Sequence, residues 1–290
     1  HILCANRCAY ALMGAGLHGS NGAGPKVCYQ IVKTYVLPRL VYGLEVLLLT
    51  KKQMNELSTY YLQLLKHIQG LPKRTASCAV YLLIGAIPAE GIVHLRQLTL
   101  IGAIARSENK SLCELAIRQL AIHSTRTSWF PRTQELLDMY DLPDMMELLD
   151  HPIAKVRWKS MCKTAVQKFW KIQLLQEGSA KSSLRYMQIA DVKCHPCYDS
   201  IACNVKEVRH ATVKARIITG TYYLQATKAR FNQMEVDPTC IMCHEEAEDM
   251  PHFLLRCQSL VDVRLPGLQL INTVLLKLSG PYCPGSVNLQ

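Results

Sequence analysis

Apolar residues recur along this chain at the three- and four-residue intervals that are typical of amphipathic helices. The clearest case begins at Thr50, a good N-cap, and ends at Gln69, after which Gly70 and Pro72 interrupt the pattern. Its apolar positions are Leu57, Tyr61, Leu64, Leu65 and Ile68. Nothing before residue 150 alternates with period two for long enough to predict a strand. We therefore expect an all-α fold.

The same periodicity predicts further helices over about 75–84, 89–106, 157–173 and 205–218. Ser111 and Glu114 have the spacing of a capping box, which predicts another short helix beginning there. Gly, Ser and Pro residues then accumulate over 176–200, as in a linker. These elements suggest three parts, which are a helical bundle over 1–125, a basic helical connector and linker over 126–200, and a metal-binding C-terminal region over 201–290.

The helix predicted over 157–173 combines an apolar stripe with lysines. The stripe contains Trp158, Met161, Ala165, Phe169 and Ile172, and Lys159, Lys163 and Lys171 lie away from it. Trp170 falls on the arc of Lys159 and Lys163, where its ring could stack on a nucleic-acid base. The more common arrangement is a Trp that docks against another helix, and this is the interpretation we favour.

Positive charge is concentrated in the middle of the chain. The formal net charge is +11, and residues 151–235 contain fifteen Lys/Arg against five Asp/Glu. Such an excess favours a polyanionic partner, because cations that neutralise phosphates release counterions. Solvated helix faces that keep a basic protein in solution would give the same composition.

The thirteen cysteines are odd in number and scattered, which argues against a disulfide framework. We expect most of them to be reduced in an intracellular protein of the nucleus or cytoplasm. The longest apolar run contains Gly85 and Pro88 and is too short to cross a bilayer, so no membrane partner is predicted.

Four of these soft ligands have the spacing of a metal site. Cys240 and Cys243 are separated by two residues, eight residues precede His252, and four more precede Cys257. The first pair fits a tight turn, and Pro251 could begin a helix that presents the second pair. Three thiolates and one imidazole leave no open position, so we predict a structural Zn²⁺. His244 and the adjacent Glu245 are expected to be exposed and not to bind it.

A weaker candidate surrounds Cys194 and Cys197, which also have a two-residue gap. Cys203 could supply a third ligand. Pro196 lies inside the gap, however, and there is no clear fourth ligand, His210 being the best available.

Two stretches of the sequence resemble the C-terminal part of non-LTR (LINE-type) retrotransposon reverse transcriptases. The first is the basic segment Val213–Leu224 followed by the Cys-Cys-His-Cys module, which ends in His252-Phe-Leu-Leu-Arg-Cys257. The second is Tyr35–Glu45 with its continuation Leu71–Thr75, similar to the start of the thumb of those enzymes. The resemblance touches both ends of the chain, and residues 110–200 match only loosely.

The resemblance implies a thumb-like bundle and zinc-binding tail whose polymerase palm would lie upstream of His1. The sequence contains no adjacent pair of aspartates for two catalytic metal ions, so we expect no catalysis from this chain alone. Its function would be to hold template–primer or element RNA, with RNA or DNA as the partner. The cations expected to contact phosphates are Lys159, Lys163, Lys171, Lys214, Arg216, Lys228 and Arg230.

Two alternatives belong to other classes of protein. In the first, the chain is a protein-interaction module derived from a retroelement, and zinc only staples a small subdomain. In the second, it is an enzyme with a Cys–His pair, which is less favoured because no pair has a recognisable family spacing.

Overall fold

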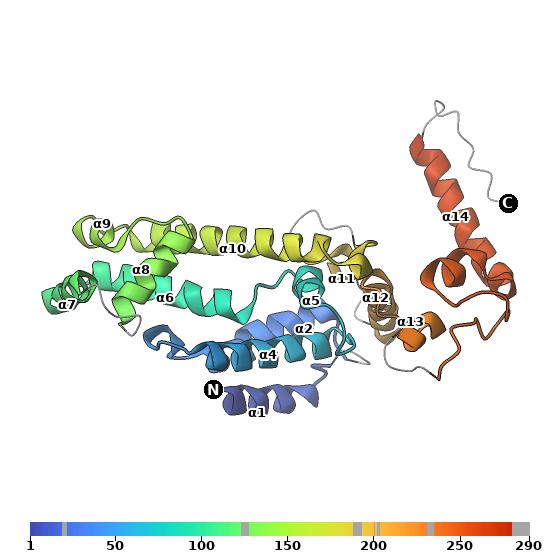
Figure 1. The fold of residues 1–290 in the computed structure, drawn as a ribbon, viewed down its shortest axis with the longest axis horizontal. Helices are drawn as coiled ribbons and strands as arrows, with labels where there is room; N and C mark the ends of the chain where they lie inside the picture. The colour runs from blue at the N-terminus through green and yellow to red at the C-terminus, as the bar shows by residue number, and fades with distance from the viewer. Residues whose placement is uncertain are drawn as a thin grey trace. The chain divides into compact units, whose positions relative to one another are not determined.

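The computed structural model describes residues 1–18, 22–122, 128–187, 193–199, 201, 204–230 and 235–279 (Figure 1). The fold is 71% helical, and the described part contains no strand. Thr239 and Ala247 form an isolated antiparallel bridge. The expected all-α class is therefore confirmed.

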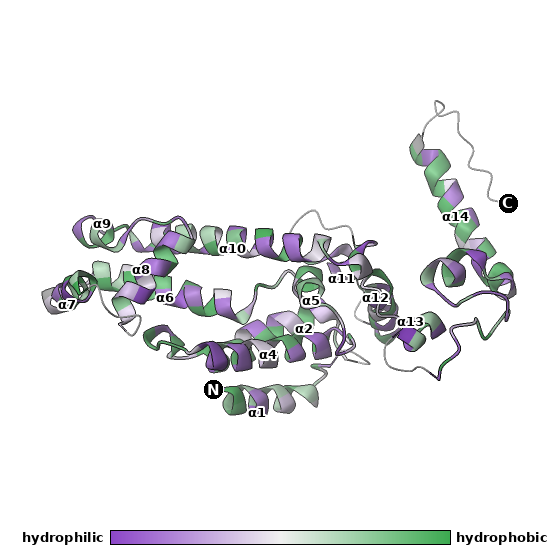
Figure 2. Ribbon diagram, in the orientation of Figure 1, coloured by the Kyte–Doolittle hydropathy of each residue, from purple (hydrophilic) through white to green (hydrophobic). Residues whose placement is uncertain are grey.

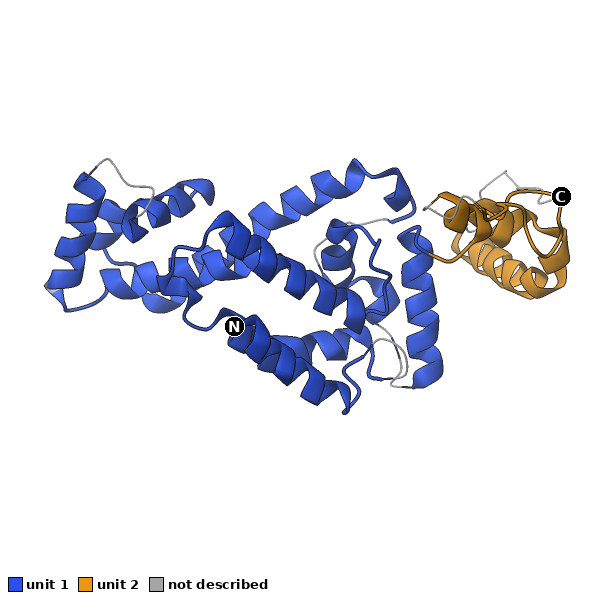
Figure 3. Cartoon of the chain, turned by 60° about the horizontal axis from the view of Figure 1, so that its bottom comes forward, with its two compact units in different colours: residues 1–221 blue, residues 222–290 orange. Residues whose placement is uncertain are grey.

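The chain divides into two compact units, residues 1–221 and residues 222–290 (Figure 3). The helices of the first unit are α1 (Ile2–Met13), α2 (Pro25–Ile31), the π-helical turn Val32–Val36, α3 (Leu37–Val41), the 3₁₀ turn Leu44–Val46, α4 (Lys51–Ile68), α5 (Ser77–Ile84), α6 (Ala89–Ala105), α7 (Lys110–Ala121), α8 (Trp129–Met139), α9 (Met145–Asp150), α10 (Lys155–Ser179), the 3₁₀ turn Ser182–Leu184, α11 (Pro196–Asp199) and α12 (Val205–Ile218). Those of the second unit are α13 (Gln225–Arg230), the π-helical turn His252–Arg256, the 3₁₀ turn Gln258–Leu260 and α14 (Val261–Ser279).

Local chemistry explains why α4 has the predicted bounds. The Thr50 hydroxyl accepts a hydrogen bond from the Gln53 backbone N–H, and the Gln53 side chain accepts one from the Thr50 N–H, which completes a capping box. Gly70 ends the segment with φ +62°, a left-handed conformation that favours glycine. All five predicted apolar positions of α4 are buried.

The cap of α7 differs from the prediction. Asn109, not Ser111, is the N-cap, and its side-chain oxygen accepts a hydrogen bond from the Ser111 N–H at 3.1 Å. The helix therefore begins one residue before Ser111, and the predicted capping box at Ser111 and Glu114 is wrong. Asn is as good a cap as Ser, so the sequence offered two competing starts.

Two clusters of buried side chains form the core of the first unit. One gathers α1 to α5 with parts of α10 and α12, and the other gathers α6 to α10 around Trp158. Hydrophilic and hydrophobic residues are interleaved along the whole of α10 (Figure 2), and its buried side places Trp158 and Val166 in the second cluster and Leu174 in the first. Ile172, expected on the buried stripe, is 44% exposed.

Two tryptophans of α10 pack directly against glycines of α6. A Cβ atom added at Gly102 would lie 2.1 Å from Trp158 Cδ1, and one added at Gly91 would lie 2.4 Å from Trp170 Nε1. The Trp158 indole N–H donates to the Leu98 carbonyl oxygen at 2.8 Å. Trp170 therefore docks against a helix, as favoured from the sequence, and its ring is partly buried rather than presented for stacking.

This packing changes the expected division of the chain. Because α10 lies along α6 and α5, residues 126–200 are part of the first compact unit and not a separate connector (Figure 1). The helical character predicted over 157–173 continues to Ser179, so residues 176–179, expected in a linker, are part of α10. α12 also belongs to the first unit, which moves the boundary from residue 200 to Thr221.

In the described part of the chain, no single helix combines the length and apolar character needed to cross a membrane. The bent pair of α5 and α6 meets the length and composition criteria when the two helices are taken together.

Candidate metal centre

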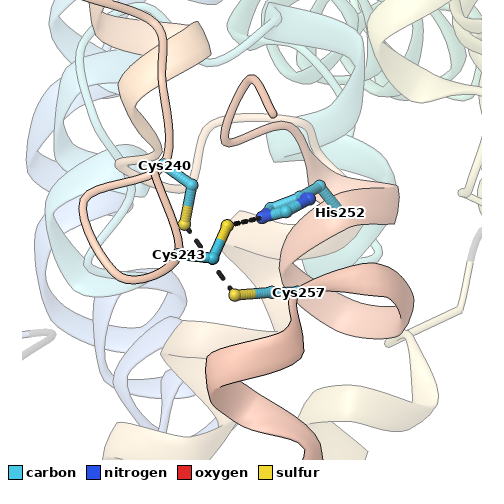
Figure 4. Close-up of side chains that lie close together, drawn as sticks. All are labelled: Cys240, Cys243, His252 and Cys257. Atoms are coloured by element: carbon cyan, nitrogen blue, oxygen red, sulfur yellow. Dashed lines mark hydrogen bonds between the residues drawn. The ribbon is translucent and has the colours of Figure 1, made fainter. Parts of the chain in front are cut away.

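The structure brings the four predicted ligands together in the second unit. The ligand atoms of Cys240, Cys243, His252 and Cys257 all lie within 4.8 Å of one another. Figure 4 shows the three sulfur atoms and one edge of the imidazole pointing toward a common centre. Three of the four side chains are buried and Cys243 is half-buried, so the cluster is closed to solvent on most sides. This group could hold a metal ion.

A tight turn positions the first two cysteines. The Cys240 N–H donates to the Glu246 carbonyl oxygen at 2.8 Å, and the His244 N–H donates to the Cys240 carbonyl oxygen at 2.9 Å. His244 has φ +58°, which lets the chain reverse between these two hydrogen bonds. Asp237 fixes the entry to the turn by accepting the Thr239 N–H at 2.9 Å.

A single helical turn positions the other two ligands. It begins after Pro251, which is the predicted start, and contains His252 as its first residue. The Cys257 N–H donates to the His252 carbonyl oxygen at 2.8 Å and closes the turn, so both side chains face the cysteine pair (Figure 4). Leu254 and Leu255 of this turn are 39% and 62% exposed, so the turn is held by its ligand side rather than by an apolar core.

The environment of Cys240 favours the thiolate, which is the form that binds metals. Burial raises the pKa of Cys240, but the backbone N–H groups of Cys243 and Met242 and the side chain of His252 outweigh it and bring the pKa to about 7. The Met242 N–H lies 3.5 Å from the Cys240 sulfur. In contrast, burial raises the pKa of Cys257, which lies with its sulfur 3.9 Å from that of Cys240.

Carboxylates behind His252 orient its ring. Glu246 Oε2 lies 3.2 Å from Nδ1, and Nε2 on the other side of the ring lies 3.3 Å from the Cys243 sulfur. The His252 backbone N–H donates to Asp249 at 2.8 Å, and Arg256 lies 3.4 Å from both carboxylates. A carboxylate at Nδ1 leaves Nε2 for a metal ion, as in many zinc sites. Sequence reasoning missed Glu246, although an acidic residue six positions before a ligand histidine was a usable signal.

The cluster is joined to α13 by a buried carboxylate. Glu248 is 8% exposed, and its Oε2 accepts the Gln225 N–H at 2.7 Å at the start of that helix. The rings of Tyr222 and Phe253 also pack with centroids 5.9 Å apart. These two contacts attach Tyr222 and the start of α13 to the segment that carries the ligands. His244 and Glu245 are exposed, as expected.

The structure gives little support to the second cysteine candidate. Cys203 lies outside the described residues. Burial raises the pKa of Cys197 to about 12 and also raises that of Cys194, and the Cys197 N–H donates to His195 Nδ1 at 3.2 Å. His210 is exposed, 3.9 Å from Glu207. Over the described ranges, Cys240, Cys243, His252 and Cys257 are the only group of three or more metal-ligating side chains brought together.

The structure also locates the seven cations predicted to contact phosphates. Lys159 and Lys163 are exposed on α10, Lys214 is exposed on α12, and Arg230 is exposed on α13. Lys171 and Lys228 are half-buried. The Arg216 guanidinium donates to the Gly70 carbonyl oxygen from Nε at 2.9 Å and from Nη2 at 2.6 Å, so it holds the end of α4 in place.

Three cations that sequence reasoning did not single out share α10 with the predicted ones. Lys155, Arg157 and Lys168 are all exposed. Counting charge along the whole predicted helix would have found them, since the 25 residues of α10 contain six cations and one carboxylate, Glu177.

Comparisons of this chain with protein-family models, with curated proteins and with solved structures found no match.

Proposed function

We propose that this chain binds nucleic acid through the cations of α10 and that its Cys-Cys-His-Cys cluster holds a structural Zn²⁺. The observation that carries the proposal is the charge of α10, with six cations against one carboxylate, while its apolar side is fixed on α6 and α5. A helix anchored in this way presents its charges at fixed positions, which lowers the entropy lost when it binds a polyanion.

The spacing of these cations suits a phosphate backbone. Lys155, Lys159 and Lys163 follow one another at four-residue intervals and therefore lie in one row on the helix surface. Adjacent members are separated by about 6 Å along the helix axis, close to twice the axial spacing of about 3.4 Å between phosphates of one strand. Contacts of this kind fix the register of a nucleic acid without reading its sequence.

Zinc is proposed for the cluster because of its donor set. Three thiolates and one imidazole are soft ligands that favour Zn²⁺ in tetrahedral coordination, and they leave no position open for a substrate. The role of the ion would be to hold the second unit folded. It would keep α13, with Lys228 and Arg230, attached through Glu248.

We further propose that the chain is the C-terminal portion of a non-LTR reverse transcriptase, holding template–primer or element RNA inside the cell. The resemblance of Val213–Leu224 and of the Cys-Cys-His-Cys module supports this origin. Reduced cysteines fit an intracellular location, since the eleven cysteines of the described part are all unpaired. The polymerase palm would be supplied upstream, so no polymerase activity is expected of this chain alone.

The decisive measurement is the salt dependence of binding to a single-stranded RNA and to a duplex. Replacing Lys155, Lys159 and Lys163 together by Gln should weaken binding and reduce the slope of log K against log salt by about 2 to 3, one phosphate contact for each lysine. A matched triple replacement of Lys33, Lys52 and Lys277, exposed lysines on other elements, should leave the slope close to that of the unmodified protein. Equal slopes for the two triple variants would contradict the proposal.

One observation favours the alternative of a protein-interaction module. Nine apolar side chains of α14 are at least 40% exposed, from Val261 to Leu278. A protein partner that docks on α14 should not be displaced by RNA, whereas the proposed function requires that RNA displaces any acidic protein from the cations of α10.

A further inference from the structure

The first unit contains a cavity that the proposed function does not use. It has a volume of about 740 Å³ and lies among the first turn of α4, α6 and α8, helices that neighbour one another in Figure 1. Its apolar walls include Leu49, Met54, Val93 and Leu136. The polar groups that α6 contributes are Glu90, His94 and Gln97, and Lys51 and Arg132 are the cations that line the cavity. The volume is sufficient for a ligand the size of a nucleoside.

A chain of hydrogen bonds fixes the tautomer of His94. Trp170 Nε1 lies 3.1 Å from the Tyr140 hydroxyl, and an indole nitrogen can only donate. The Tyr140 oxygen therefore accepts this hydrogen bond and donates its own hydrogen to His94 Nδ1, 2.8 Å away. Since Nδ1 is the acceptor, the ring proton of neutral His94 is on Nε2.

His94 is neutral at physiological pH. Burial lowers its pKa to about 4, with a smaller contribution from the nearby Arg132 guanidinium. The side chain is only 7% exposed, and its Nε2 lies 3.9 Å from Glu90 Oε1, which is too long for a hydrogen bond. A buried N–H donor and a carboxylate acceptor, one turn apart on α6, thus lie side by side on the cavity wall.

We propose that this cavity binds a guanine base. The O6 oxygen of guanine would accept from His94 Nε2, and its adjacent N1–H and N2–H groups would donate to the two oxygens of Glu90. Adenine, cytosine and uracil each present one ring-edge donor beside an acceptor, so they can engage only one carboxylate oxygen in this way. The apolar walls would cover the faces of the ring, and Lys51 would lie near the phosphate.

The same base could come from a free nucleotide or from a nucleic-acid strand. The proposal does not depend on α10, because a mononucleotide presents the same edge without a phosphate backbone. If the strand is the source, the cavity would add recognition of one unstacked guanine to binding that is otherwise independent of sequence.

Calorimetric titration with mononucleotides tests the proposal. We expect GMP to bind more tightly than AMP, CMP or UMP. IMP, which lacks the 2-amino group, should bind about tenfold more weakly than GMP, as expected for one lost hydrogen bond to a charged group. 1-Methyl-GMP should not bind. The free-nucleotide and strand sources are separated by comparing GMP with single-stranded oligonucleotides that contain one guanine or none.

Variants locate the site. Glu90→Gln should remove the preference of GMP over IMP, whereas Glu114→Gln on α7, an exposed position away from the cavity, should keep it. Circular dichroism shows whether each variant is folded. Tyr140→Phe is a second test: it removes the hydroxyl that donates to His94 Nδ1, so the ring proton is no longer held on Nε2 and GMP binding should weaken. Guanine-containing ligands that bind no better than the other bases, or a Glu90→Gln variant with unchanged preference, would overturn the proposal.

The replacement of Lys155, Lys159 and Lys163 should not alter GMP binding. A failure of the guanine proposal can therefore be distinguished from a failure of the proposed phosphate contacts.

Discussion

At the scale of single residues, the support behind His252 is as informative as the ligand itself. Nδ1 of this ring faces Glu246, and Arg256 lies beside both Glu246 and Asp249. This carboxylate at Nδ1 favours the ring orientation in which Nε2 faces the Cys243 sulfur, 3.3 Å away. The orientation of the ligand is thus determined by a residue that does not touch the metal position.

Glu246→Ala should therefore weaken zinc binding by about 10- to 100-fold. Glu246→Gln, which keeps an acceptor oxygen, should recover much of this loss. The affinity is measured by competition with a chromophoric chelator, and the absorption bands of the Co²⁺-loaded protein report the coordination geometry. Glu245→Ala is the matched control, because Glu245 is the exposed neighbour. If Glu246→Ala and Glu245→Ala bind zinc equally well, Glu246 does not position His252.

The buried His94 predicts a pH dependence of stability. Its pKa is about 4 in the folded chain and about 6.5 when unfolded. The unfolded state therefore binds more protons between these values, and stability falls as the pH is lowered from about 6.5 to about 4, by roughly 3 kcal/mol from this residue. Urea unfolding followed by tryptophan fluorescence measures it, since Trp129, Trp158 and Trp170 all lie in the first unit.

The comparison is with His94→Gln, which cannot titrate. Between pH 7 and pH 4 the unmodified protein should lose about 3 kcal/mol more stability than this variant. The same pH dependence in both proteins would show that His94 does not cause the loss.

At the scale of elements, the contact between α6 and α10 depends on glycine. Gly102 lowers the intrinsic stability of α6 by about 1 kcal/mol relative to alanine, yet the indole of Trp158 occupies the space that a Cβ would fill. Close packing therefore outweighs helix propensity at this position. The same holds at Gly91 under Trp170.

Gly102→Ala should lower the free energy of unfolding by about 1 to 3 kcal/mol, because a Cβ at this position would overlap Trp158. Gly178→Ala in α10 is the control, since its nearest neighbour would be Leu82 Cδ1 at an ordinary 3.8 Å. That replacement should be neutral or stabilising by up to about 1 kcal/mol. Urea unfolding compares the two, and equal stability would refute the role of Gly102.

The elements also show what a sequence can and cannot predict. The bounds of α4 and α12 follow from local caps and apolar spacing, which a sequence displays directly. The buried side of α10 could not be predicted from a single straight stripe. Buried and partly buried residues recur there every four positions, at Trp158, Cys162, Val166, Trp170 and Leu174. Each such step advances about 40° beyond a full turn, so the buried line winds around the helix from α6 toward α5. A single straight stripe ending at Ile172 could not describe contacts with two partners.

At the scale of the whole molecule, the same distinction applies to the site. The four ligands lie within 18 residues, and their spacing was sufficient to predict that they meet. The contact of Arg216 with the Gly70 carbonyl joins residues 146 positions apart, and no local sequence pattern predicts it. Sequence reasoning therefore treated a residue that holds two helices together as a candidate for phosphate binding.

The second unit is where metal removal should have its largest effect. Among its described residues few side chains are buried, and these include Cys240, His252 and Cys257, with Leu224 as the main aliphatic one. We therefore expect this unit, with so little apolar core, to depend on the proposed metal ion for most of its folding free energy. The first unit has two extensive clusters of its own and needs no such support.

Chelation of zinc should therefore unfold residues 222–279 and leave residues 1–221 folded. We expect backbone amides of α13 and of the His252–Arg256 turn to lose protection from hydrogen exchange, while tryptophan fluorescence stays unchanged because all three tryptophans are in the first unit. Cys243→Ser should reproduce the effect without a chelator, and Cys197→Ser, which changes a cysteine outside the cluster, should not. Protection that survives chelation in the second unit would mean that its hydrogen bonds, such as that between Gln225 and Glu248, hold it without a metal ion. A change in tryptophan fluorescence would instead mean that the folding of the first unit also depends on the metal.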